Sequence, residues 1–120
     1  MKISLTNIGD KNYITDYGSN FVSINNTRYR GNLIITPDSV DDTWNNSPPF
    51  SVESIKFLSF LDVEILIIGT GLKHQVLSPA TIQPLIEKPL SFEIMSTPAA
   101  CRTFNILVAE DRNIGAALLI

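Results

Sequence analysis

The most constraining feature of this 120-residue sequence is the alternation of apolar segments and proline-marked helix starts in its second half. Residues 64–68 form a nearly continuous apolar run, which is typical of a buried strand. Residues 90–95 alternate apolar and polar side chains, and residues 114–120 form a last strand candidate. Five of the six residues from 115 to 120 are apolar and none is charged, so we expect this strand to lie inside a sheet, covered on both faces.

Two helices separate these strands. Ser78-Pro79 and Thr97-Pro98 each place a capping hydroxyl before a proline at the first helical position. The first helix is predicted to end near Lys88, and the second near Glu110. Strands that alternate with helices of about ten residues indicate βαβ units with helices packed on a sheet.

The first third of the chain indicates short strands. We expect them at residues 13–17, 21–24, 27–29 and 33–36, in a meander of about four strands. Asn25-Asn26 fits a two-residue hairpin turn, because asparagine tolerates a positive φ.

A proline-rich loop over residues 37–51 follows the meander, with Trp44 in its middle. Trp44 is either a lid over the core or an exposed anchor. A helix is predicted after Ser51, and its apolar face is expected to comprise Val52, Ile55, Phe57, Leu58 and Leu61.

The composition narrows the class of protein. Apolar residues make up 44% of the chain and charged residues 18%, against roughly 25% charged in average domains. The low charge indicates a soluble folded domain with apolar surface left for a partner. The net charge is −3 and the nine Lys and Arg are scattered, so nucleic acid is not the expected ligand.

One cysteine, Cys101, and one histidine, His74, predict no disulfide, no metal site and no cofactor. The N-terminal residues 1–6 resemble neither a signal peptide nor a presequence. The longest apolar stretch, residues 57–68, is shorter than the ~20 residues of a membrane span and is interrupted by charges. We therefore expect a cytoplasmic protein.

Three features could carry chemistry. Gly69-Thr70-Gly71 follows an apolar strand, where a phosphate loop would lie, but the motif has neither a third glycine nor an immediate helix. It is either a tight turn or an anion site. Cys101 is either a nucleophile or a small buried hydrophobe on the face of Ala100, Phe104 and Val108, and the second role is favoured because the motif contains no base.

The third feature is the outer face of the last helix. Arg102, Asn105 and Ile106 are predicted to stand there, near the positive end of the helix dipole. They form either a partner surface or a solvated face on which Arg102 pairs with Glu93 or Glu110.

The last helix also carries a family resemblance. The string TPAACRTFNIL at residues 97–107, followed by Glu110-Asp111-Arg112 and Ala116-Ala117-Leu118, resembles the signature of domain of unknown function family 498. That family includes the mitochondrial complex I assembly factor 3. Earlier residues fit as well, and the match spans about residues 13–120: Tyr17-Gly18, Phe21, Tyr29, Gly31, Pro37, Trp44, Ile67-Ile68 and Gly69-Thr70-Gly71.

The resemblance implies a single α/β domain over residues 1–120, with three layers, a mixed central sheet and about three helices. It implies no catalytic residues. The favoured function is a non-enzymatic protein-binding or assembly-helper domain in a bacterial protein, linked through the family to respiratory complex I assembly. The alternative is a small-molecule or anion-binding domain, with enzymatic activity left open, that uses Gly69, Thr70, Gly71 and the helix start at Thr97. The sequence names neither the partner nor the oligomeric state.

Overall fold

The computed structural model describes residues 10–120, so the expectation about residues 1–6 lies outside the described residues. A five-stranded mixed sheet lies at its centre, with the strand order β5-β4-β8-β6-β7. β8 runs parallel to β6 and antiparallel to β4, and β6 runs parallel to β7. The strands of this sheet are β4 (Leu33–Ile35), β5 (Val40–Asp41), β6 (Ile65–Gly69), β7 (Ser91–Met95) and β8 (Ile114–Leu118).

β8 lies in the middle of this sheet, as predicted. All five of its residues are buried, because side chains from both faces of the sheet pack against it. The expectation that the last strand is internal is confirmed.

A separate three-stranded antiparallel sheet has the order β1-β2-β3. Its strands are β1 (Ile14–Tyr17), β2 (Val22–Ile24) and β3 (Thr27–Tyr29). Asn25 and Asn26 form the predicted turn with φ values of 48° and 70°. The predicted four-stranded meander is wrong in one strand, because β4 leaves this sheet and pairs with β8. The strand β5 lies inside the segment expected to be a loop.

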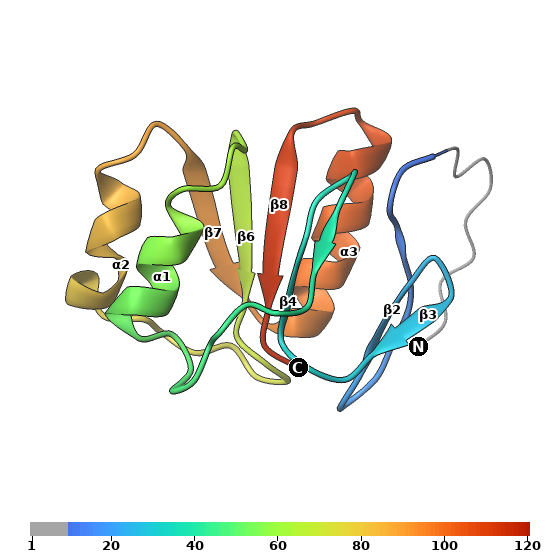
Figure 1. The fold of residues 1–120 in the computed structure, drawn as a ribbon, viewed down its shortest axis with the longest axis horizontal. Helices are drawn as coiled ribbons and strands as arrows, with labels where there is room; N and C mark the ends of the chain where they lie inside the picture. Colours follow the sequence, from blue (N-terminus) through green and yellow to red (C-terminus); the bar gives the residue numbers. More distant parts are fainter. Residues whose placement is uncertain (1–9) are drawn as a thin grey trace.

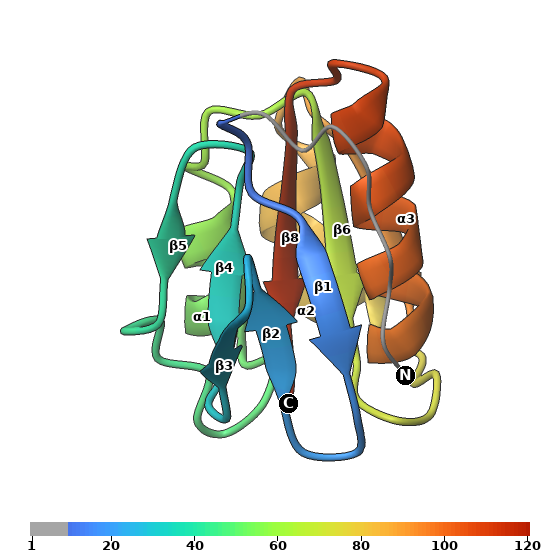
Figure 2. The ribbon, with the colours of Figure 1, turned by 90° about the vertical axis from the view of Figure 1, so that its right-hand side faces the viewer.

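The helices pack on both faces of the central sheet and so form the outer layers of the fold (Figure 1). α1 (Val52–Leu58) and α2 (Pro79–Ile86) cover one face of the central sheet, and α3 (Thr97–Ala109) covers the other. The three-stranded sheet lies on the same side as α3, next to that helix (Figure 2). The predicted three-layer α/β fold with three helices is confirmed.

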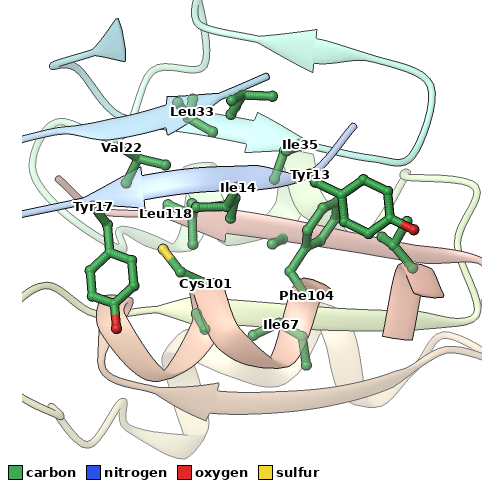
Figure 3. Close-up of a cluster of buried hydrophobic side chains, with 14 of the residues drawn as sticks. Tyr13, Ile14, Tyr17, Val22, Leu33, Ile35, Ile67, Cys101, Phe104 and Leu118 are labelled. Atoms are coloured by element: carbon green, nitrogen blue, oxygen red, sulfur yellow. The ribbon is translucent and has the colours of Figure 1, made fainter. Parts of the chain in front are cut away.

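Alternation along the central strands divides the core into two clusters. Ile67, Ala116 and Leu118 face α3 and the small sheet, where Ile14, Val22, Cys101 and Phe104 complete the cluster (Figure 3). Leu66, Ile68 and Ala117 point the opposite way and pack with residues of α1, α2 and the 41–51 loop.

Of the two helix starts predicted from a capping hydroxyl before proline, the first has the predicted cap and the second is capped one residue earlier. Ser78 caps α2, and its side chain accepts from the backbone N–H of Thr81. The cap of α3 is Ser96 rather than Thr97, because Thr97 already has helical geometry and its hydroxyl is used elsewhere. No helix within residues 10–120 is long and apolar enough to cross a membrane.

Candidate functional site

The Gly69-Thr70-Gly71 loop and the start of α3 meet at the end of β6. The backbone N–H of Gly71 donates to Oγ1 of Thr97 at 2.8 Å, and the N–H of Thr97 donates to the carbonyl of Gly71 at 2.7 Å. The Thr97 hydroxyl then donates to the carbonyl of Leu119 at 2.7 Å. Thr97 therefore ties the loop, the helix and the C-terminal strand together.

Gly69 is required here by a close approach of α3. A Cβ on Gly69 would lie 2.9 Å from Oγ1 of Thr97 and 3.1 Å from its Cα. It would also lie 3.0 Å from Cδ2 of Leu118. The first glycine of the motif thus lets the helix start pack against the strand end.

Thr70 organises the rest of the loop. Its side chain is fully buried, and its backbone N–H donates to the carbonyl of Met95 at 2.8 Å. Its Oγ1 lies 3.0 Å from the carbonyl of Lys73 and accepts from the N–H of Gln75 at 3.0 Å. The hydroxyl is occupied in shaping residues 70–75.

The N–H groups at the start of α3 are engaged within the protein. Ala99 donates to the Ser96 hydroxyl at 3.4 Å, Ala100 donates to the Ser96 carbonyl at 2.9 Å, and Pro98 has no N–H. The cavity between this helix start and the small sheet measures about 20 Å³. That volume is close to the space of a single water, so an anion would have to displace protein groups to bind there.

Asn105 does not stand on the outer face of α3. It is only 8% exposed, and its carboxamide pairs with the backbone of Ile14 in β1. Oδ1 accepts from the Ile14 N–H at 2.8 Å, and Nδ2 donates to the Ile14 carbonyl at 2.8 Å. The outer-face prediction is wrong for Asn105, because β1 packs along the side of the helix that the sequence indicated as polar.

Arg102 and Ile106 are exposed on α3, as predicted. Nη1 of Arg102 donates to the hydroxyl of Tyr17 at 2.7 Å. The partner of Arg102 is therefore a tyrosine of β1, and neither Glu93 nor Glu110 is within ion-pair distance among residues 10–120.

Cys101 lies in the core between α3 and the two sheets, and its side chain is fully buried (Figure 3). Burial raises the pKa of the Cys101 thiol to about 12, which outweighs the opposite effect of the Arg102 charge. The thiol stays protonated at neutral pH, so the predicted structural role agrees with its surroundings. Residues 10–120 contain no cluster of His, Cys, Asp or Glu that could hold a metal ion.

Large apolar side chains are exposed on α1 and in the turn after it, and two of them, Val52 and Phe57, were expected on the apolar face of this helix. Val52 and Phe57 are about half exposed, and Phe60 is 69% exposed. Of the predicted apolar face, Ile55 and Leu58 are fully buried. Two turns of helix bury only one stripe, so the flanking positions remain at the surface. A groove of about 460 Å³ between the helices is lined by Val52 and Phe60.

A second hollow, of about 590 Å³, lies on the other side of α1, against the 41–51 loop. Trp44 lines it but is only 6% exposed, which favours the core role over an exposed anchor. Within the described part of the chain, neither the indole N–H of Trp44 nor the Asn46 amide nitrogen has a hydrogen-bond partner. Sequence patterns contain no signal for this hollow, because a loop brings its residues together.

Comparisons with known proteins agree with this fold. The model of the family described as "Protein of unknown function (DUF498/DUF598)" matches residues 14–119. NADH dehydrogenase (ubiquinone) 1 alpha subcomplex assembly factor 3 of Mus musculus is 34% identical over 111 residues, which cover 89% of this chain and 60% of the relative. The chain therefore spans about three fifths of the length of that relative.

Two bacterial proteins are also similar. The "13 kDa major membrane protein" of Francisella tularensis is 37% identical over 89 residues, which cover 68% of this chain and 63% of that protein. A crystal structure of a Bordetella parapertussis protein superposes with a TM-score of 0.81 at 29% identity, and covers 92% of this chain and 97% of that one.

Proposed function

This chain belongs to the DUF498/DUF598 family, and from that premise we propose that it acts as a protein-binding domain without a catalytic role. We further propose that it assists the assembly of a respiratory complex of the complex I type, as the name of the mouse relative describes for that protein. A cytoplasmic location is part of this proposal, and cell fractionation measures it.

The observation that carries the proposal is the apolar surface of α1 and α2. Val52 and Phe60 line one groove, and Phe57 and Ile86 are exposed on the same helix pair. The ammonium group of Lys88 lies 4.6 Å from the centre of the Phe60 ring. Aromatic side chains are enriched at protein interfaces, so a groove lined by an exposed ring and an exposed valine favours a protein contact.

The geometry around Gly71 and Thr97 also favours protein binding over the anion-binding alternative. The N–H groups of Gly71 and Thr97 donate hydrogen bonds to each other's residue and are not available to an anion. The cavity beside them has room for about one water. The exposed part of α3, with Arg102 and Ile106, is kept as a second candidate contact surface.

An affinity capture from lysate of the native organism tests the proposal. The tagged chain is expected to recover a specific protein, and the double variant Val52→Ser, Phe60→Ser is expected to lose it. Val52 is about half exposed and Phe60 is 69% exposed, so the melting temperature should change little. Arg102→Ala and Ile106→Ser test the second candidate surface on α3, and both should retain the partner if α1 and the turn after it form the binding surface.

Two results would count against the proposal. Capture of no specific protein by the wild-type chain removes its basis. Retention of the partner by the Val52→Ser, Phe60→Ser variant, together with its loss by the α3 variants, would move the binding surface to α3. The link to complex I requires subunits or assembly factors of that complex among the captured proteins.

A further inference from the structure

The hollow beside α1 has a lining with a distinct chemistry. Asp41 and Glu53 supply carboxylates, and Trp44 and Phe57 supply rings; we call these four residues the acidic–aromatic pocket. We propose that this pocket receives an arginine side chain of the partner protein. The proposal rests on the protein-binding function above and names the chemistry of the segment that binds.

The carboxylates of the pocket have capacity for a cation. Glu53 is exposed in the first turn of α1. Oδ1 of Asp41 accepts from the N–H and the hydroxyl of Thr43, at 2.8 and 2.6 Å. An ionised carboxylate offers about four lone-pair sites, so Asp41 keeps its second oxygen for an incoming donor.

Among the described residues, no cation of the chain itself balances these charges. The residues lining the pocket include no Lys or Arg, and Lys56 of the same helix lines the groove on its other side. The ion pairs among residues 10–120 involve Asp16 and Asp111 instead. A positively charged group from outside would complete the charge balance of the pocket.

The aromatic part favours arginine among cations. Phe57 is half exposed at the pocket, and a planar guanidinium stacks on a ring while its N–H groups reach carboxylates. The same arrangement occurs within residues 10–120. The Arg28 guanidinium lies 3.8 Å from the centre of the Phe21 ring, with Nη2 3.8 Å from Oδ2 of Asp16.

The loop that forms the pocket wall has unsatisfied donors. Nε1 of Trp44 and Nδ2 of Asn46 are buried without a partner among residues 10–120, although Oδ1 of Asn46 accepts from the Phe50 N–H at 2.7 Å. Phe50 is held at a φ of 54°, which is unusual for a bulky residue. An arginine side chain offers only donors, so these two N–H groups would pair with carbonyl oxygens of the segment that carries the arginine.

The size of the pocket suits a side chain with its neighbours. A volume of about 590 Å³ lies within the range of roughly 300–1,000 Å³ that is typical of ligand sites. An arginine on an extended segment would fill it, with polar groups of Thr43, Asn45 and Ser47 at its rim available to the backbone of that segment.

Trp44 is the only tryptophan and lines the pocket, so the one indole N–H signal can be assigned to this wall of the pocket without ambiguity. We would titrate the ¹⁵N-labelled full chain with N-acetyl-arginine amide and follow the indole N–H and backbone resonances by NMR. Saturable shifts at Trp44, Glu53 and Phe57 are expected, with a Kd of about 1 mM for so small a probe. The matched citrulline compound, which lacks the charge, should not saturate.

Variants locate the site. Glu53→Gln is expected to raise the Kd by about threefold, and Asp41→Asn serves as a second variant if Glu53→Gln perturbs the fold. Glu93→Gln, an exposed carboxylate on β7, is the matched control and should leave the Kd unchanged. Equal shifts with arginine and citrulline probes, shifts confined to other surfaces, or a response to Mg²⁺ but not to arginine would each overturn the proposal.

The two proposals fail separately. If the arginine probe does not bind while Val52→Ser, Phe60→Ser abolishes partner capture, the pocket assignment is wrong and the protein-binding function stands. If the probe binds as expected but no partner is captured, the pocket assignment survives and the proposed function loses its support.

Discussion

At the scale of single residues, Asn105 fastens α3 to the small sheet. Its carboxamide exchanges two hydrogen bonds with the backbone of Ile14, in the way that two paired strand residues do. Arg102, one turn earlier, makes a more exposed contact with the Tyr17 hydroxyl. Both residues connect α3 with β1, but only Asn105 satisfies buried backbone groups.

Asn105→Ala should destabilise the protein more than Arg102→Ala. The first change leaves the buried N–H and carbonyl of Ile14 unpaired, at about 1–3 kcal/mol for each group. The second removes one hydrogen bond at the surface and should cost less than about 1.5 kcal/mol. Urea unfolding midpoints compare the two, and an equal loss for both variants would show that the carboxamide contacts contribute little.

The buried thiol of Cys101 makes the free energy of unfolding depend on pH in the alkaline range. Its folded pKa, about 12, is above the value of 9.0 for an exposed thiol, so below pH 9 the thiol is protonated in both states and has no pH effect. Between pH 9 and 12 the unfolded chain loses the proton while the folded chain keeps it. The free energy of unfolding should therefore fall by about 1.4 kcal/mol per pH unit in this window.

Cys101→Ala is the control for that prediction. The variant should lose about 1–2 kcal/mol of stability at neutral pH but decline less steeply from about pH 9 to 11. Denaturant unfolding at several pH values across this range gives both slopes. Parallel slopes for the two proteins, or rapid alkylation of the native thiol at neutral pH, would contradict the burial of Cys101.

At the scale of elements, the junction of β6 and α3 depends on close packing at Gly69. Gly69→Ala should cost about 1–3 kcal/mol, because the new methyl group would press on the Thr97 backbone and on Leu118. Gly31→Ala is a matched control, since apart from the adjacent residues of the chain no described heavy atom lies within 4 Å of the place its methyl group would take. Thermal melts that rank the two substitutions equally would show that the junction can relax.

The element α1 shows why a correct helix prediction assigned too many residues to the core. The sequence indicated the helix after Ser51 and its buried residues Ile55 and Leu58, and both features are present. The same periodicity counted Val52 and Phe57 as core. Those residues flank the buried stripe, and only the placement of α2 and the 41–51 loop leaves them at the surface.

For the whole molecule, the C-terminal segment connects both layers of the core. Leu118 is fully buried in the α3 cluster, Leu119 packs against the other cluster, and its N–H donates to the Gly69 carbonyl at 2.9 Å. Ile120 donates from its backbone to Oδ1 of Asn32 at 3.1 Å. A segment at the end of the chain thus completes the central sheet.

Deleting residues 118–120 should abolish folding. Loss of the buried Leu118 alone costs ~2–5 kcal/mol against a total stability of ~5–15 kcal/mol, and the hydrogen bonds of Leu119 are lost as well. Deleting Ile120 alone removes a partly buried side chain and should leave a folded protein. Circular dichroism melts distinguish the two, and a three-residue truncation that melts like the full-length chain would show the segment to be peripheral.

The sequence by itself determined the type and place of most elements. Periodicity located β6, β7, β8 and the three helices, serine and proline marked the start of α2, and a run of uncharged residues predicted that β8 is internal. These features are local, or depend on burial of both faces of one strand, so a single segment contains the signal.

Only the tertiary structure decided which elements meet. In the structure β4 pairs with β8 instead of continuing the meander. β1 packs over the polar side of α3 and buries Asn105. Asp41, Trp44 and Phe57 line one hollow. Each of these contacts joins residues that are distant in the sequence. The periodicity of a segment records how much of its own surface is buried, but it carries no record of which neighbour covers that surface.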